Sequence, residues 1–145
     1  LIKKFTIKTK KTIHFTTNLK TKKVYADKEF LKEAISNLID NAIKYSKESV
    51  KINISSSSDA NHDIINIYDN GIGIPQKDQK KIFEKFERAS AIKQTRKGGP
   101  SGFGLGLNYV YQVMEAHEGR VYINSIEGEF SEFSLLIPKI IESYD

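Results

Sequence analysis

Short stretches of the chain alternate between apolar and polar residues at period two, which is typical of β-strands that bury one face. The alternation predicts strands over residues 11–17, 50–57, 63–69, 120–126 and 132–137, and shorter ones over residues 5–8 and 22–25. A polar loop over residues 55–61 is expected to join two of the strands. The last two strands flank residues 127–129 and are expected to form a hairpin that buries Phe133, Leu135 and Ile137 on one face.

Apolar residues at helical spacing predict two long helices with a short one between them. The first helix is expected to begin after Asp27, whose carboxylate can cap the first turn, and to end near Tyr45. The short helix is predicted over residues 76–87, and the last one from residues 102–107 to a stop before Gly119. The expected core positions are Leu31, Ile35, Leu38 and Ala42 in the first helix, Ile82, Phe83 and Phe86 in the short one, and Leu105, Tyr109, Val113 and Met114 in the last.

The composition is that of one globular domain. The 145 residues suffice for a single core, expected over about residues 11–138. No apolar run is long enough to span a bilayer, and the absence of Cys excludes disulfides and agrees with a cytoplasmic location.

The net charge of +5 arises largely from the first 23 residues, which are rich in Lys and contain no acid. Such a segment could contact nucleic acid or an acidic membrane, but solvated strand faces explain the lysines as well, so no nucleic-acid partner is expected. Because the chain starts at Leu1, we expect it to be part of a longer protein.

Residues 69–75 (DNGIGIP) form the strongest candidate for a functional site. Asp69 ends a predicted strand on the same face as Ile65 and Ile67, so this strand carries a carboxylate into the interior. Gly71 and Gly73 can turn the backbone sharply and leave no side chain in the way of a ligand. An Asp beside such a loop can accept a hydrogen bond from a flat ligand, although an ordinary strand turn explains the pattern as well.

A second candidate lies on one shoulder of the first predicted helix, about 90° from its apolar stripe. Asn37 and Asn41 are one helical turn apart, so their amides can converge on one ligand. A carboxamide oxygen suits Mg²⁺, which usually keeps several waters and phosphate oxygens. Lys44 could reach a phosphate and Tyr45 offers a ring for stacking, although such residues on a helix flank are most often simply solvated.

The segment before the last helix is a candidate phosphate-binding loop. Residues 89–101 are cationic and rich in Gly and Pro, which is typical of lids over binding sites. Gly102, Gly104 and Gly106 then open a helix, where free backbone N–H groups and the helix dipole favour phosphate. No G-K-[ST] sequence follows, so a P-loop is excluded. The three histidines lack the spacing of a zinc site, and no G-x-S-x-G sequence presents a nucleophile.

Taken in order, these stretches resemble the ATP-binding catalytic domain of sensor histidine kinases, within the wider superfamily of DNA gyrase, the large heat-shock chaperone and the mismatch-repair ATPases. The matching segments are residues 37–46 (N box), 69–75 (G1 box), 82–86 (F box) and 102–107 (G2 box). The resemblance implies an α/β two-layer sandwich, the Bergerat fold, in which a mixed sheet of five or more strands carries three main helices on one face. A lid would occupy about residues 87–103.

The resemblance also implies which residues bind Mg²⁺ and the phosphates of ATP. Asn41 would coordinate the metal with help from Asn37, and Lys44 and Arg88 would approach the phosphates. The hinge of the lid and the remaining phosphate contacts would come from Gly102, Gly104, Leu105 and Gly106.

At the other end of the nucleotide, the resemblance implies an adenine pocket. Asp69 would accept a hydrogen bond from the adenine amino group, and Tyr45 would pack beside the ring. Ile74 would form a wall, and Gly71 and Gly73 would let the purine come close.

One position separates a kinase from a hydrolase in this superfamily. The ATPase branch has a glutamate four residues before the metal-binding Asn, where it activates water. Here that position is Asn37, which cannot take a proton at neutral pH, and Glu33 points away by roughly 40°. The resemblance therefore implies a protein-histidine kinase that presents the γ-phosphate of ATP to a histidine.

The phosphoacceptor is expected on an upstream dimerisation domain, because no histidine of this chain has the sequence context of an acceptor. A response regulator would receive the phosphoryl group next, and the parent protein would be a homodimer, with or without a membrane anchor. The isolated chain should bind ATP and barely autophosphorylate. Two alternatives stay open, namely an anti-sigma-type Ser/Thr protein kinase on the same fold and a degenerate nucleotide-binding module.

Overall fold

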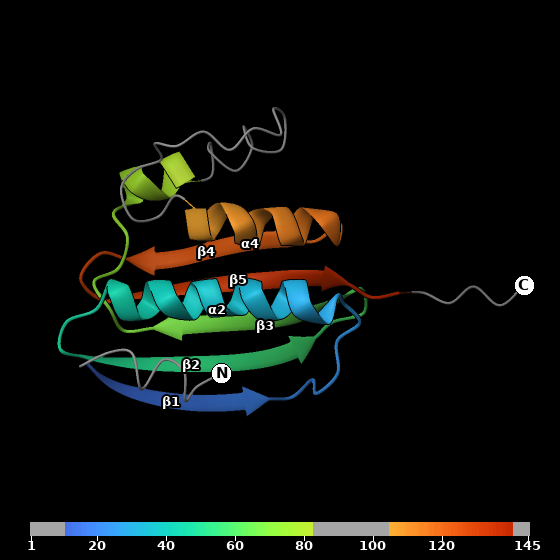
Figure 1. Cartoon of the computed structure of the whole chain (residues 1–145), viewed down its shortest axis with the longest axis horizontal. Coiled ribbons are helices and arrows are strands. Elements are labelled where there is room, and N and C mark those ends of the chain that lie inside the picture. Colours follow the sequence, from blue (N-terminus) through green and yellow to red (C-terminus); the bar gives the residue numbers. More distant parts are fainter. Residues whose placement is uncertain (1–10, 83–104, 141–145) are drawn as a thin grey trace, which may run out of the picture.

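A computed structural model describes residues 11–82 and 105–140. In these ranges a five-stranded sheet has the order β1-β2-β3-β5-β4 (Figure 1). Neighbours β1 and β2 are parallel, and the other neighbouring pairs are antiparallel, so the sheet is mixed as predicted. The strands are β1 (Thr12–Leu19), β2 (Ser49–Ser58), β3 (His62–Asp69), β4 (Arg120–Ile126) and β5 (Phe130–Pro138).

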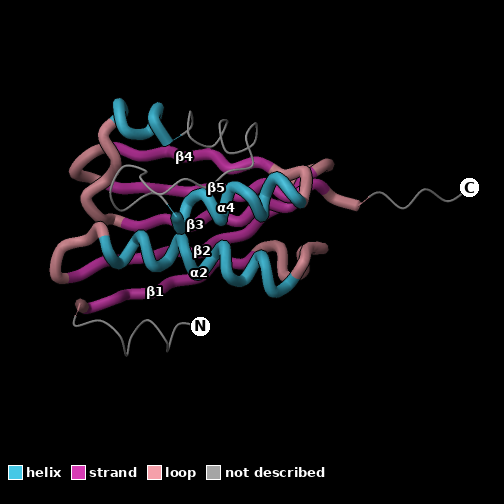
Figure 2. The backbone as a smooth tube through the Cα atoms, turned by 45° about the horizontal axis from the view of Figure 1, so that its top comes forward, coloured by secondary structure: helices cyan, strands magenta, loops and turns pink. Residues whose placement is uncertain are grey.

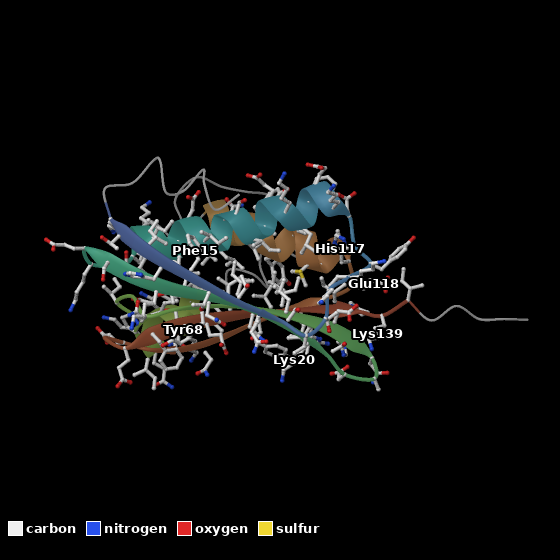
Figure 3. All side chains as sticks on the ribbon, turned by 90° about the horizontal axis from the view of Figure 1, so that it is seen from below. Phe15, Lys20, Tyr68, His117, Glu118 and Lys139 are labelled. Atoms are coloured by element: carbon white, nitrogen blue, oxygen red, sulfur yellow. The ribbon has the colours of Figure 1, made fainter. Side chains whose placement is uncertain are left out.

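Two long helices, α2 (Lys28–Lys44) and α4 (Leu105–Ala116), cover one face of the sheet (Figures 1 and 3). Helix α2 begins where predicted, because the Asp27 side chain accepts a hydrogen bond from the Phe30 N–H at 3.0 Å. A third helix begins at residue 76 and is described as far as residue 82. None of the described helices is long and apolar enough to cross a membrane.

The core lies between the two long helices and the sheet, and apolar burial there is the main stabilising term of the fold. Alternation along β3 and β5 sends every second side chain into this core, and Tyr68 lies on the opposite face (Figure 3), stacked on Phe130 with ring centroids 5.7 Å apart. The largest fully buried side chains include Leu38, Ile39, Ile52, Ile67, Leu107, Met114, Leu135 and Ile137.

Three sequence predictions about the elements are wrong. Residues 22–25 form no strand. The last hydrogen bond of the edge strand β1 runs from the Lys20 N–H to the Ser56 carbonyl, and the chain then crosses over to α2. The strand predicted over residues 50–57 is confirmed, but the loop predicted over residues 55–61 begins too early. Strand β2 continues to Ser58, since ladder pairing uses backbone groups and tolerates polar side chains. In α4, Val113 and Met114 are buried as predicted, but Tyr109 is only half-buried. Leu107 and Val110, which were not predicted, complete the buried stripe.

The predicted helix stop at Gly119 has a different cause from the one expected. Glu118, not Gly119, adopts the left-handed conformation, with φ of 56°. Gly119 is required because a Cβ there would lie 2.3 Å from the Leu136 carbonyl oxygen. The predictions for residues 5–8, for Phe83 and Phe86, and for the lid over about residues 87–103 fall outside the described ranges.

Candidate functional site

Three element ends meet at one end of the domain (Figures 1 and 2). Helix α2 ends there, β3 ends there with Asp69, and α4 begins there. The third helix, from residue 76, starts at the same end. The fold therefore brings residues 69–75, the end of α2 and the start of α4, which are far apart in the sequence, into one region.

A small cavity of about 20 Å³ lies between the end of α2, the end of β3 with the loop that follows it, and the start of β5. Its described lining combines one carboxylate, one carboxamide, two aromatic residues, one serine and a glycine, and it includes residues of both candidate stretches of the sequence analysis. The lining residues are Asn41, Ala42, Tyr45, Asp69, Gly73, Ile74, Ser131 and Phe133.

Among the described residues that line this cavity, Asp69 is the only carboxylate, and the residue is 6% exposed. Burial raises the pKa of Asp69 to about 6, and the Gly71 N–H, which donates to the carboxylate at 2.8 Å, opposes that rise in part. An ionised, poorly solvated carboxylate is a strong hydrogen-bond acceptor for a ligand that brings its own donor.

The loop after Asp69 is held tightly against α2. The Ile72 N–H donates to the Tyr45 carbonyl at 3.0 Å, and the Gly128 N–H donates to the Ile72 carbonyl at 2.6 Å. A Cβ on Gly71 would lie 2.6 Å from the Tyr45 carbonyl oxygen. Gly73 has φ of 69°, and a Cβ there would lie 2.2 Å from the Ile126 carbonyl oxygen. Gly73 thus has the positive φ that the sequence predicted, whereas Gly71 is required because the Tyr45 carbonyl approaches it closely.

Two serines belong to the site and were missed from the sequence. Ser131 is opposite Asp69 in the β3–β5 register and is 5% exposed. The Ser125 hydroxyl lies 2.9 Å from that of Ser131, accepts from the Ile74 N–H at 2.8 Å and donates to the Phe130 carbonyl at 2.7 Å. Ser131 shares the inward alternation of Phe133 and Leu135, and that signal would have placed it on the buried face.

The two carboxamides of α2 face different neighbours. The Asn41 side chain lines the cavity, and its Nδ2 is buried without a hydrogen bond among the described residues. Asn37 does not line the cavity. It lies beside the first turn of α4 instead, because its Oδ1 is 3.9 Å from the position that a Cβ on Gly106 would occupy. The exposed Lys44 ammonium is 5.7 Å from the centre of the Tyr45 ring.

These groups can serve an elongated ligand with an apolar, donor-bearing end near Asp69 and an anionic end near α4. Arg88, Gly102 and Gly104 lie outside the described residues, and of Leu105 only its place at the start of α4 is described. No cluster of His, Cys, Asp and Glu in the described ranges could hold a metal, so a cation here would depend on carboxamides and on the ligand itself.

Solved structures share this architecture. The mycobacterial sensor histidine kinase MprB superimposes with a TM-score of 0.67 and 27% identity, over 87% of this chain and 81% of that chain. The catalytic domain of histidine kinase ThkA superimposes with a TM-score of 0.70 and 26% identity, over 88% of this chain and 80% of that chain. Fold and site together thus define a catalytic domain of the histidine kinase type.

The chain belongs to the histidine kinase-, DNA gyrase B-, and HSP90-like ATPase family, whose model matches residues 26–141. The resemblance inferred from the sequence motifs is therefore confirmed. Adaptive-response sensory kinase SasA of Crocosphaera subtropica is 36% identical over 116 residues, which are 79% of this chain and 29% of that protein. Sensor histidine kinase WalK of Bacillus subtilis is 32% identical over 149 residues, covering 100% of this chain and 24% of that protein. The chain thus spans less than a third of the length of these relatives.

Proposed function

We propose that this chain is the ATP-binding catalytic domain of a two-component sensor histidine kinase, which presents the γ-phosphate of ATP to a histidine on a separate dimerisation domain. The observation that carries the proposal is that Asp69 and Asn41, from elements far apart in the sequence, line one cavity. Family membership and the names of SasA and WalK agree with it.

The adenine ring would bind at the Asp69 end. The Asp69 carboxylate accepts a hydrogen bond from the amino group, Ile74 and Phe133 supply apolar walls, and Ser131 adds a hydroxyl beside the carboxylate. The cavity of about 20 Å³ holds roughly one water molecule, so the purine must displace its walls to enter.

The triphosphate and Mg²⁺ would bind at the Asn37 and Gly106 end. The residues present fit the metal, because Asn41 and Asn37 are one helical turn apart and can offer two carboxamide oxygens to it. The buried Asn41 Nδ2, a donor without a partner among the described residues, would donate to a phosphate oxygen. When bound, Mg²⁺ neutralises phosphate charge. The start of α4 offers backbone N–H groups to the phosphates, Lys44 adds a positive charge, and Arg88, Gly102, Gly104 and Leu105 remain predicted contacts.

The site is built to present the phosphoryl group rather than to hydrolyse ATP. Asn37 cannot act as a general base. Among the described residues that line the cavity, Asp69 is the only carboxylate, and it lies at the adenine end. Phosphoryl transfer would then depend on positioning and charge stabilisation, with the attacking histidine supplied from outside the site.

The acceptor would come from another part of the protein. His117 is held between the Asp27 N–H and the Val113 carbonyl, and His62 lies 3.5 Å from Asp59, so neither lines the cavity. An upstream dimerisation domain would carry the acceptor histidine, and a response regulator would receive the phosphoryl group. The parent protein would be a homodimer with this domain in the cytoplasm.

Titration with a fluorescent ATP analogue, with and without Mg²⁺, tests the proposal. The wild-type chain should bind, Asp69→Asn should lose affinity under both conditions, and Asn41→Asp should change the dependence on Mg²⁺. Unchanged affinity in both variants would favour a degenerate module. In a parallel incubation with γ-labelled ATP, stoichiometric phosphohistidine on this chain would contradict the requirement for a separate acceptor domain.

A further inference from the structure

The ammonium group of Lys11 caps the C-terminal end of α2 from a distant part of the sequence. Its Nζ donates to the Ile43 carbonyl at 2.7 Å and to the Ser46 carbonyl at 2.9 Å, with longer contacts of 3.4 Å to the Lys44 carbonyl and 3.3 Å to the Ser46 hydroxyl. The last carbonyls of a helix lack partners within the helix and carry its negative dipole. A cation with three donors therefore suits this position.

The start of β1 holds Lys11 in this place. Strand β1 begins at the end of the domain where α2 stops (Figures 1 and 2), and the Thr12 N–H donates to the Glu48 carbonyl at 3.0 Å. Parallel pairing of Thr12 with Ser49 continues from there. The backbone at the start of β1 is thus fixed by residues 48 and 49, and the Lys11 side chain reaches the end of α2 from there.

The carbonyls that Lys11 binds flank Tyr45 on both sides. Tyr45 lines the cavity, its N–H donates to the Asn41 carbonyl at 3.0 Å, and its carbonyl accepts from the Ile72 N–H at 3.0 Å. Any change in this last turn of α2 would therefore move both the ring of Tyr45 and the loop that follows Asp69. Lys11 itself does not line the cavity.

We propose that Lys11 is a positioning residue for the nucleotide site: its ammonium group fixes the last turn of α2 so that Tyr45 and the loop at residues 70–74 keep the geometry that binds adenine. This inference rests on the proposed function, because it assumes that the cavity takes ATP. It adds a residue that lies outside every sequence motif of the site.

Affinity measurements on Lys11→Met and Lys11→Arg in the whole chain test this role. Met keeps the aliphatic stem but removes the charge and the donors, and should raise the Kd for ATP with Mg²⁺ about fivefold. Arg keeps charge and donors and should restore most of the affinity. Lys20→Met, at the opposite end of β1, is the control with the same loss of charge and should bind as the wild type. Calorimetric titration at a temperature where circular dichroism shows every variant folded gives these values.

The outcomes separate this role from the proposed function. A wild-type chain that does not bind ATP would refute the nucleotide site itself. A wild-type chain that binds, together with a Lys11→Met variant of equal Kd, would refute the role of Lys11 alone. An Arg variant as weak as the Met variant would also refute it, because the charge and donors would then not be the cause.

Hydrogen exchange distinguishes positioning from general stabilisation. In Lys11→Met the Ile72 amide should exchange at least about tenfold faster, while the Ile67 amide inside β3 keeps its rate. Equal acceleration of both amides would overturn the proposal. If Lys11→Met does not fold, NMR of the wild-type chain tests the proposal instead. The Lys11 Nζ resonance should shift on saturation with ATP, and that of Lys20 should not. A Lys11 resonance that does not shift would refute the link between Lys11 and the nucleotide site.

Discussion

Replacing Asp69 with Asn should stabilise the ligand-free domain and weaken its affinity for ATP at the same time. Burial raises the pKa of Asp69 from 3.8 to about 6, so the folded protein holds an ionised carboxylate at neutral pH against its solvation preference. Because each pKa unit corresponds to about 1.4 kcal/mol, this cost is about 3 kcal/mol above pH 6. Asn is neutral at every pH and keeps an oxygen for the Gly71 N–H.

The sign of the pH dependence follows from the direction of the pKa change. The folded state binds the Asp69 proton more tightly than the unfolded state does. The contribution of Asp69 to stability is therefore fully present below pH 3.8, is lost as the pH rises to about 6, and stays lost above it. Between pH 4 and pH 7 the stability of the variant relative to the wild type should therefore rise by about 2.4 kcal/mol.

Urea unfolding followed by circular dichroism at several pH values measures this difference, since the other titrating groups cancel between the two proteins. Asp40→Asn, which removes an exposed carboxylate from α2, is the matched control and should show no such trend. At pH 7.5 the affinity of Asp69→Asn for ATP should fall at least about tenfold, because a charge-assisted hydrogen bond is lost. A variant that is less stable than the wild type at pH 7, or a stability difference that does not change with pH, would refute the reasoning.

Three further changes probe the metal end, the loop and the helix start. Asn41→Ala should remove most of the gain in ATP affinity that Mg²⁺ gives, while adenosine binds as before in the same calorimetric titration. Gly71→Ala places a Cβ 2.6 Å from the Tyr45 carbonyl oxygen and should destabilise the fold by about 2 kcal/mol in thermal unfolding, whereas Gly128→Ala, with φ of 82° and open space, should cost only about 1 kcal/mol. Asp27→Ala removes the cap on the Phe30 N–H and should cost about 1 kcal/mol with an unchanged Kd for ATP.

The strands and the start of α2 could be predicted because their signals are local. Alternation along residues 63–69 and 132–137 matches β3 and β5, and the Asp27 cap is an interaction over three residues. The segment at 22–25 shows the limit of such signals. Its alternation resembles that of a strand, but the polypeptide there crosses from an edge strand to a helix, which only the sheet order reveals.

The site was predictable where a residue type has one strong chemical reason to be present. Asp69, Asn41 and the glycines of the loop are of this kind, and the structure brings them together. Alternation could place Ser131 on the buried face, but its position opposite Asp69 was not predictable, because it depends on the long-range pairing of β5 with β3. The contact of Lys11 with the end of α2 was not predictable either, because it depends on the pairing of β1 with β2. A serine in a strand and a lysine before one have many equivalent explanations until that pairing is known.

A crystal structure of the domain with Mg²⁺ and a non-hydrolysable ATP analogue would show whether Asp69 and Asn41 hold opposite ends of one nucleotide. We expect the adenine amino group within hydrogen-bond distance of the Asp69 carboxylate, and the metal bound through the Asn41 side-chain oxygen, with the cavity widened between them. A nucleotide bound at full occupancy that contacts only one of these two residues, or neither, would contradict this expectation.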